Sequence, residues 1–223
     1  CAMEDPDPRV SGNGIRALRQ AGIDVEVGLL RERAEELNRA YLTHRREGRP
    51  FVILKLAQSL DGRIATASGA SRWITGDAAR RHVHEWRSRV DALAVGASTV
   101  ATDDPSLDAR HRRRRQRRDP RPIVIDGQVR VSTEARVFAH EGAILATLES
   151  TPSVRQQQFR DRGVEVWTFS ECGGRIDLRD LARKAACNDV TSLIVEGGGV
   201  LAAAALADGI VDRLMVYVAP IVI

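Results

Sequence analysis

Apolar runs and amphipathic segments alternate along most of the chain after Pro50. The apolar runs are rich in Val, Ile and Leu and short enough for strands; they read FVILKLA, DALAVG, PIVIDG, AILATL, VEVWTF, SLIVEGGG and RLMVYVAPIVI. Helical residue spacing is found in three segments: 77–89, 178–186, and VLAAAALADG after the sixth apolar run. This alternation predicts an α/β fold whose sheet is covered by helices on both faces.

The segment 77–89 is the most detailed of these helix predictions. We expect Thr75 to cap its N-terminus, because a hydroxyl can accept from the free amides of the first turn. The apolar face of this helix consists of Ala79, Val83, Trp86 and Val90. That face is expected to pack on the sheet.

The residues before Pro50 follow a different pattern. A short helix is predicted in GIRALRQAG and ends at Gly22, a strand in IDVEVG, and a second helix in 30–43. The apolar face of that second helix would consist of Leu30, Ala34, Leu37 and Tyr41. The basic turn HRREGRP follows, so we place a domain boundary there, with one domain remnant in 1–46 and a second domain in 47–223. Because the sequence ends in an apolar strand with no turn after it, we expect the second domain to be truncated at its C-terminus.

Composition narrows the class of protein. Apolar residues make up 43% of the chain and charged residues 29%, and no apolar run reaches the ~20 residues that cross a bilayer. This balance predicts a cytoplasmic globular protein without a membrane segment. The three cysteines have no CxxC spacing, so neither a disulfide framework nor a metal site is expected.

A dense basic cluster, Arg112–Arg118 (RRRRQRR), contributes much of the net charge of +4. Such a cluster could neutralise the phosphates of a nucleic acid, which makes a basic nucleic-acid-binding protein the alternative function. Aromatic residues are only 4% of the chain and none interleaves with these arginines, so platforms for base stacking are missing. The pattern favours a solvated loop insertion over a nucleic-acid partner.

The Gly-rich segment SLIVEGGGVLAAAAL carries the clearest ligand-binding signal. A strand runs into three glycines and then a helix, which places bare amides and a positive helix end at the carboxyl edge of the sheet. Gly197, Gly199 and Ala202 even fit the dinucleotide pattern G-x-G-x-x-A. The next strand lacks the terminal acid that would bind a ribose hydroxyl, which disfavours a standard NAD-binding unit. Tight helix packing is the alternative role for these glycines.

Two further features are candidates for binding or catalysis. The loop VGASTVATDDPSLDAR follows a buried strand and offers Ser98, Thr99 and Asp103 to a phosphate or sugar, although an ordinary capped turn would look the same. Lys55 interrupts an apolar strand, where a rigid backbone could aim its ammonium at a substrate. The alternative is a lysine that extends from a strand edge into water.

Three ordered segments resemble a known family: LKLAQSLDGRIATASGASRWITG, VGASTVATDDPSL and IVEGGGVLAAAALADGIVDRLMVYVAP. Over 49–223 the chain is similar to the reductase domain of the bifunctional deaminase-reductases of riboflavin biosynthesis, the RibD family, and the preceding residues resemble the end of their deaminase domain. The resemblance implies a dihydrofolate-reductase-like mixed sheet flanked by helices, preceded by the tail of a cytidine-deaminase-like domain.

The resemblance also implies an activity. It is the NADPH-dependent reduction of the ribosyl group of 5-amino-6-(5-phosphoribosylamino)uracil, a small phosphorylated pyrimidine, to the ribitylamino product. Lys55 and Glu196 would be the catalytic residues, with Glu196 meeting the substrate from the side opposite to Lys55. A homo-oligomer is compatible with the resemblance.

The binding residues are likewise carried over from the family by position. Substrate contacts would come from Ser71, Arg87, Leu107, Arg110 and Glu196. Cofactor contacts would come from Ala57, Trp73, Thr99, Asp103, Gly198, Gly199, Val200, Leu201, Ala202, Ala203 and Ala204. Gly127 stands where the family pattern has a serine, so any cofactor contact there would involve backbone.

The deaminase half of the family needs zinc, which H-x-E and P-C-x-x-C motifs bind. This sequence has neither motif, so zinc is expected only in a deaminase part that these residues do not include. His82 and His84 are two apart on a predicted helix and would point to different faces. We therefore expect no metal site in this chain.

Overall fold

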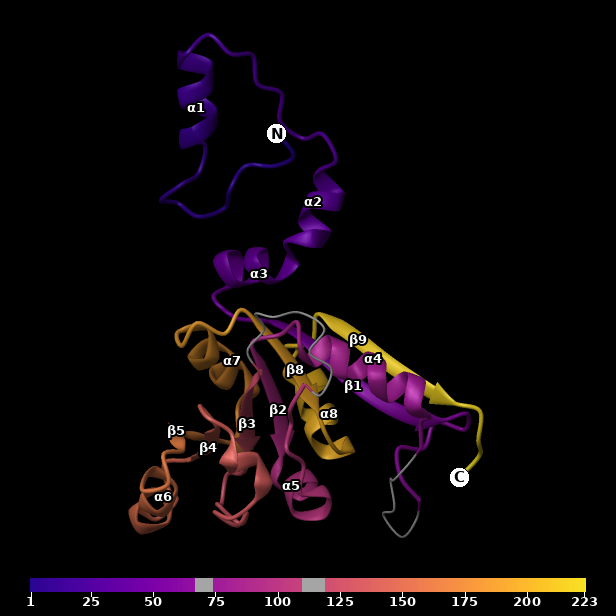
Figure 1. Ribbon diagram of the computed structural model, residues 1–223. Helices are drawn as coiled ribbons and strands as arrows, with labels where there is room; N and C mark the ends of the chain where they lie inside the picture. Colours follow the sequence, from indigo (N-terminus) through magenta and orange to yellow (C-terminus); the bar gives the residue numbers. More distant parts are fainter. Residues whose placement is uncertain (67–73, 110–118) are drawn as a thin grey trace.

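The computed structural model describes residues 1–66, 74–109 and 119–223. A body built on one sheet carries an N-terminal arm, which projects from the end of the body where β1 begins (Figure 1). The strands are β1 Phe51–Ser59, β2 Ala92–Gly96, β3 Arg121–Ile125, β4 Ile144–Leu148, β5 Glu165–Phe169, β6 Glu171–Cys172, β7 Arg175–Ile176, β8 Ser192–Glu196 and β9 Arg213–Ala219. The helices are α1 Asn13–Gln20, α2 Arg31–Leu37, α3 Arg39–Glu47, α4 Asp77–Arg87, α5 Ala97–Asp103, the 3-10 helix η1 Arg136–Ala139, α6 Ser153–Arg160, α7 Leu178–Ala186 and α8 Gly199–Ala207.

Seven strands form the central sheet in the order β5-β4-β3-β2-β8-β1-β9, and β6 pairs with β7 in a separate hairpin. All seven apolar runs are strands of the central sheet, which confirms the predicted α/β class. Every pairing described in this sheet is parallel, whereas the resemblance implied a mixed sheet. β1 lies between β8 and β9, so residues far apart in the sequence become neighbours along it.

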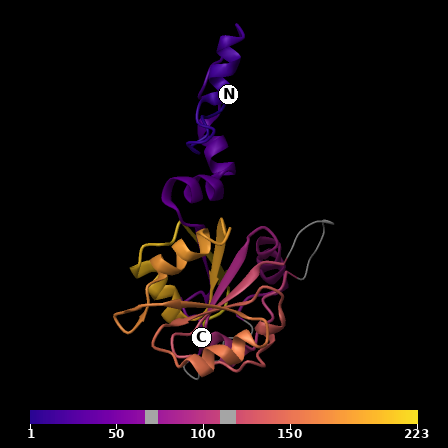
Figure 2. The same cartoon turned by 90° about the vertical axis from the view of Figure 1, so that its left-hand side faces the viewer.

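Helices cover both faces of the sheet, as predicted. Val52 and Leu54 of β1 pack with α7 and α8 on one face. Phe51 and Ile53 face the other way and pack in a core that includes α5 and α6. Because successive side chains of a strand point to opposite faces, strands buried on both sides must be apolar throughout. Figure 2 shows the gold helices α7 and α8 on one side of the sheet, with α4 and α5 across it.

Local sequence explains where two of the helices begin. Asp177 caps α7 by accepting a 2.8 Å hydrogen bond from the Arg179 amide, and α7 has the predicted bounds. In α4 the N-cap is Gly76, not Thr75, and the side chain of Thr75 makes no cap. The carbonyl of Thr75 instead accepts from Arg80.

The apolar face predicted for α4 is buried only in part. Val83, near the middle of the helix, is buried, and so is Val90, beyond its end at Arg87. Ala79 and Trp86 are half-buried. This helix therefore keeps one flank close to solvent above β1 and β9.

The N-terminal arm differs most from the sequence predictions. The helix predicted over 30–43 is two helices, α2 and α3, which meet at Asn38. Leu30 and Leu37 are 65% and 78% exposed, whereas Leu42 on another face of the helix is buried. The segment IDVEVG is irregular rather than a strand. Helices α1 and α2 bury no side chain, so the apolar spacing there had no sheet or core to pack against.

Arg49 fixes the connection between the arm and the sheet. Its guanidinium donates to both carboxylate oxygens of Asp212, at 2.6 and 2.7 Å. Asp212 also accepts from the Val52 amide at 2.8 Å. This two-bond pair joins the start of β1 to the start of β9.

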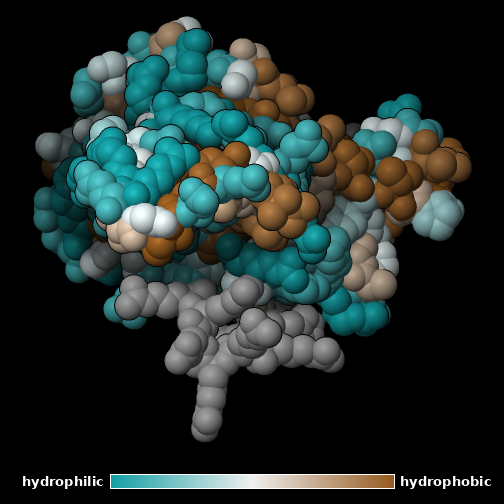
Figure 3. Space-filling view, turned by 90° about the horizontal axis from the view of Figure 1, so that it is seen from above, coloured by the Kyte–Doolittle hydropathy of each residue, from teal (hydrophilic) through white to brown (hydrophobic). Residues whose placement is uncertain are grey.

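The edge strand β9 has two different faces. Arg213, Met215 and Tyr217 are half-buried. The alternate residues Leu214, Val216 and Val218 are 54%, 39% and 54% exposed, and Figure 3 shows apolar surface on this side of the molecule.

Among the described residues, no helix is both long and apolar enough to cross a membrane.

Candidate active site

Glu196 ends β8 and is only 6% exposed, which is unusual for a carboxylate. Arg87, the last residue of α4, donates from Nε and Nη2 to its two oxygens, each at 2.8 Å. A third donor of Arg87, Nη1, reaches the carbonyl oxygen of Asp108 at 3.3 Å. A buried charge is tolerated when it is paired and hydrogen-bonded in this way.

The charges of this pair reinforce each other. Burial opposes ionisation of Glu196, but the positive charges of Arg87, Lys55 and His84 outweigh burial and lower the pKa of the carboxyl group. Burial likewise opposes the Arg87 cation, and Glu196 outweighs it, so the pKa of Arg87 is raised. Both side chains are therefore ionised in the folded protein.

Lys55 lies beside this pair. It is the register neighbour of Glu196 on β8 and of Met215 on β9. Burial lowers the pKa of Lys55, Glu196 partly offsets that effect, and Arg87 adds to it. Lys55 and Glu196 are thus side by side on one face of the sheet, which corrects the expectation that they meet a substrate from opposite sides. A desolvated ammonium in this position can donate a proton or a hydrogen bond.

The segment after β2 was expected to be a binding loop, but Ala97–Asp103 form the helix α5. The Gly-rich turn after Glu196 meets this helix. The amide of Gly198 donates to Thr99 Oγ1 at 3.2 Å. Gly198 is the N-cap of α8, and a Cβ built on it would find Thr99 Oγ1, at 4.0 Å, as its nearest neighbour. The residues 198–200 are exposed, so the backbone at the positive end of α8 is open to an anion.

The other predicted cofactor residues differ in the solvent exposure of their side chains. Ala57 on β1 and Asp103 at the end of α5 are half-buried, and Ala203 is exposed. Leu201 and Ala202 are 8% and 6% exposed and pack in the core below α8. For those two residues, only the backbone is available to a ligand.

The predicted substrate residues are described in part. Leu107 is 2% exposed, packs in the core and has a φ of 53°, a conformation that is uncommon for leucine. Its side chain is therefore a core residue, and only its backbone can contact a substrate. The predicted residues Ser71, Trp73 and Arg110, together with the arginine cluster 112–118, lie outside the described residues.

Gly127 follows β3, and its backbone is partly engaged. Its carbonyl oxygen accepts from the hydroxyls of Thr147 and Thr151, at 3.2 and 3.0 Å. A Cβ at this position would come within 3.3 Å of Leu148. The glycine is therefore explained by close packing, and its amide is the backbone group left for a ligand contact.

Sequence reasoning missed the aromatic residues next to Lys55. Tyr217 on β9 places its ring 5.9 Å from Lys55 Nζ, and its hydroxyl lies 3.0 Å from His82 Nδ1 on α4. The available signal was the alternation in RLMVYVA, which puts Tyr217 on the same face as Met215, the register neighbour of Lys55. His82 and His84 have different partners, since His84 Nδ1 is 3.2 Å from the Asp108 carbonyl oxygen. No group of His, Cys, Asp and Glu in the described ranges could hold a metal ion.

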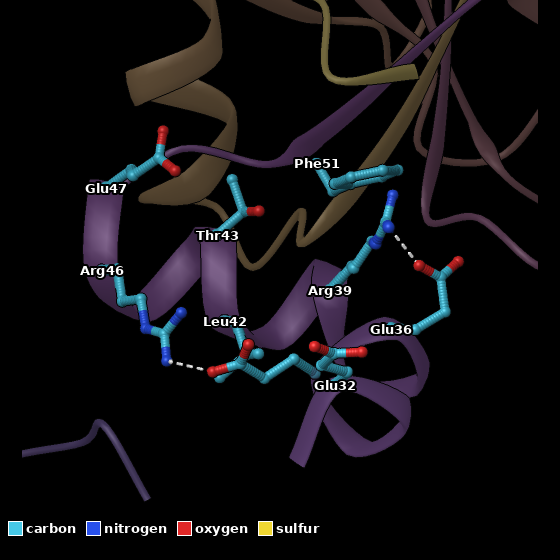
Figure 4. A pocket seen from close by; sticks show the side chains of 9 residues that line it. Glu32, Glu36, Arg39, Leu42, Thr43, Arg46, Glu47 and Phe51 are labelled. Carbon is cyan, nitrogen blue, oxygen red and sulfur yellow. Dashed lines mark hydrogen bonds and ion pairs between the residues drawn. The ribbon is translucent and has the colours of Figure 1, made fainter. Parts of the chain in front are cut away.

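A separate hollow of about 380 Å³ lies between α2, α3 and Phe51, which starts β1 (Figure 4). Two ion pairs already cross its wall, Arg46 with Glu35 and Arg39 with Glu36. It lies at the opposite end of β1 from the Gly-rich turn. The cluster around Glu196 is therefore the better candidate for chemistry.

Comparison with known proteins gives consistent matches. Residues 50–223 match the family model of the RibD C-terminal domain. The riboflavin biosynthesis protein RibD of Actinobacillus pleuropneumoniae is 39% identical over 97% of this chain and 57% of its own length. The chain therefore spans little more than half of that relative.

Two solved structures are also similar. Acinetobacter baumannii RibD superposes with a TM-score of 0.87 at 32% identity, over 100% of this chain and 60% of that one. A diaminohydroxyphosphoribosylaminopyrimidine deaminase/5-amino-6-(5-phosphoribosylamino)uracil reductase from Thermotoga maritima gives a TM-score of 0.81 at 32% identity, over 99% of this chain and 59% of that one.

Proposed function

The chain belongs to the RibD C-terminal domain family, and on that premise we propose that it reduces the ribosyl group of 5-amino-6-(5-phosphoribosylamino)uracil to the ribitylamino product. The name of the Thermotoga maritima protein includes this reductase activity. The observation that carries the proposal is the buried Arg87–Glu196 pair with Lys55 beside it, next to the exposed start of α8 at residues 198–200. This arrangement combines a proton donor, a fixed carboxylate and an anion-binding helix end.

We assign the cofactor to the Gly-rich turn and propose that it is NADPH. The exposed residues 198–200 at the positive end of α8 fit a pyrophosphate, and the Thr99 hydroxyl, which accepts from the Gly198 amide, lies next to them. The other predicted contacts, Ala57, Trp73, Asp103 and residues 199–204, remain part of this proposal. When bound, NADPH supplies a hydride.

Lys55 and Glu196 act on the substrate in this proposal. The Lys55 ammonium donates a proton or a hydrogen bond to the sugar as its ring opens, which makes C1' electrophilic. Each Glu196 oxygen accepts from Arg87 and keeps a second lone-pair direction, which can accept from a sugar hydroxyl. Arg87 was predicted to contact the substrate. Because its guanidinium faces Glu196, we instead assign it to holding this carboxylate. Ser71, Leu107 and Arg110 keep their predicted substrate contacts, Leu107 through its backbone.

The organisation of the longer relatives extends the proposal. Residues 1–46 would be the remnant of a deaminase domain, and 47–223 the reductase domain. Zinc would belong to the deaminase part that this sequence does not include. A cytoplasmic location fits a biosynthetic enzyme of this kind.

The test is a coupled measurement of cofactor and product. The chain is mixed with NADPH and the ribosylamino substrate, the loss of nicotinamide absorbance is followed, and the product is identified by mass spectrometry. The proposal expects NADPH consumption that depends on substrate and a product two hydrogen masses heavier. NADPH consumption without the ribityl product, or binding of the substrate with no reduction, would contradict it.

A further inference from the structure

Tyr217 lies directly against the proposed catalytic lysine. The Lys55 ammonium is 5.9 Å from the centre of the Tyr217 ring, within the range of a cation–π contact. Burial raises the pKa of the Tyr217 phenol, and the negative charge of Glu196 raises it further. The phenol therefore stays neutral beside a charged cluster, and its ring presents a negative face to the ammonium.

A chain of hydrogen bonds fixes the Tyr217 ring. Trp86 Nε1 is 3.2 Å from His82 Nε2, and an indole N–H can only donate, so Nε2 of a neutral His82 is the acceptor. The single proton of that imidazole is then on Nδ1, which donates to the Tyr217 hydroxyl oxygen at 3.0 Å. The Tyr217 hydroxyl hydrogen is directed to Met215 Sδ, at 3.1 Å. Every donor in this series of hydrogen bonds, from Trp86 to Met215, has an acceptor.

This series of hydrogen bonds connects α4 and β9, two elements next to the cluster of Lys55, Arg87 and Glu196. Trp86 and His82 come from α4, which ends at Arg87, and Tyr217 and Met215 come from β9. The His82 ring also meets the rings of Trp86 and Tyr217 edge to face, at 6.4 and 5.9 Å. Tyr217 is thus held from α4, the helix that also holds Glu196 through Arg87.

We propose that Tyr217, aimed by His82, is the positioning residue for the Lys55 ammonium in the reaction assigned to this site. Lys55 has a flexible stem of four carbons, and the two oxygens of its neighbour Glu196 each accept from Arg87. The aromatic face is a broad, weakly directional partner that stabilises the cation and limits where the stem can turn. Such a contact stabilises a cation, and a small displacement of a catalytic group lowers the rate.

This role rests on the proposed function, but its test does not need catalysis. The chain contains only two lysines, Lys55 and Lys184. Carbon-13 labelling of lysine therefore gives two Cε signals in an NMR spectrum, and Lys184→Arg assigns them. Lys184 lies 5.4 Å from the ring of Phe169, far along the chain from Tyr217, and serves as an internal control.

The first variant removes the ring. In Tyr217→Leu, we expect the Lys55 Cε signal to lose its ring-current shift and its titration midpoint to move to lower pH, because the cation loses a favourable partner. The Lys184 signal should stay in place. In the assay, kcat should fall about fivefold, the equivalent of roughly 1 kcal/mol, with little change in the KM for NADPH.

The second set of variants tests the role of His82. Tyr217→Phe keeps the ring and removes its anchor, so the Lys55 signal should shift by less than in Tyr217→Leu. His82→Phe, which keeps an aromatic ring beside Tyr217, should produce the same shift, and combining it with Tyr217→Phe should add nothing further, because both changes break one hydrogen bond. Additive shifts would show that His82 does not aim this ring.

The proposal is overturned if the Lys55 signal and its titration are unchanged in Tyr217→Leu, whatever happens to activity. Lower activity with an unmoved Lys55 signal would mean that Tyr217 is only part of the scaffold. Should Tyr217→Leu fail to fold, the conservative Tyr217→Phe and its cycle with His82 decide the question. Should the Lys55 signal move as expected in a chain that reduces no ribosylamino substrate, the proposed function fails and the positioning of Lys55 stands.

Discussion

Arg87 and Glu196 are separated by 109 positions in the sequence and form two hydrogen bonds of 2.8 Å with each other in the fold. The side chains are 15% and 8% exposed. This pair connects the end of α4 to the end of β8, and the Gly-rich turn begins at the next residue. The same contact therefore contributes both to stability and to the shape of the proposed site.

Breaking this pair should destabilise the fold. In Glu196→Gln the charge of Arg87 stays buried without a charged partner, and we expect a loss of about 3 kcal/mol in the free energy of unfolding. Urea denaturation would measure it. The matched control is Glu85→Gln, since Glu85 is 55% exposed and pairs with Arg89 at the surface, where a pair contributes less than about 1 kcal/mol.

The difference in unfolding free energy between the parent and Glu196→Gln should depend on pH in one direction. The folded-state pKa of Glu196 is lowered, so its stabilising charge is fully present above the unfolded-state pKa and is lost as the pH falls through the folded-state pKa. The stability of the parent and of Glu196→Gln should therefore converge in acid. A constant difference across the acid range would show that the charge of Glu196 contributes nothing.

Replacing Lys55 by methionine keeps the length of the stem and removes the ammonium. We expect NADPH binding to be nearly intact and turnover to fall roughly a hundredfold or more. Because the pKa of Lys55 is lowered, turnover by the parent should decline on the alkaline side at a lower pH than an ordinary lysine would give. Matched thermal melts would check folding, and turnover at the parent rate would remove Lys55 from the mechanism.

Gly198→Val tests the open backbone at the end of α8. Gly198 has a φ of −69°, which any residue adopts, and a Cβ there would find its nearest neighbour, Thr99 Oγ1, at 4.0 Å, so the variant should fold. A branched side chain there should obstruct the cofactor phosphates and raise the NADPH dissociation constant tenfold or more, about 1.4 kcal/mol. Gly14→Val, in the arm and also without a neighbour within 4 Å, is the control. Equal affinities would reduce the turn to a structural role.

Cofactor preference is a further prediction. No acid ends β9, the strand after α8, to bind a ribose 2'-hydroxyl, and basic side chains are plentiful in the chain. NADPH should therefore bind more tightly than NADH in a fluorescence titration. Indistinguishable affinities would contradict this preference.

The sequence predicted the sheet well because its strands are buried. A parallel strand covered on both faces must be apolar at every position, as in Val52, Leu93 and Ile194, and such runs are conspicuous. The arm was predicted less well, because its apolar residues have helical spacing but their side chains are not buried. Leu37 has helical spacing and is still 78% exposed.

The site was predictable where chemistry follows directly from residue type. Lys55, Glu196 and the Gly-rich turn were identifiable, since a charge in an apolar run and three glycines before a helix are rare. That Arg87 faces Glu196 depends on how α4 crosses the sheet, and that Leu107 is a core residue depends on its left-handed backbone. Tyr217 was missed because its partner His82 lies 135 positions away.

The most direct test of the central claim is the transfer of label from NADPH to the substrate. The chain is incubated with the ribosylamino substrate and NADPH that carries deuterium on the transferable position of its nicotinamide ring, and the product is examined by NMR and mass spectrometry. We predict one deuterium, located at C1' of the ribityl chain. Product without deuterium, deuterium at another carbon, or no product from a folded chain that binds NADPH would contradict it.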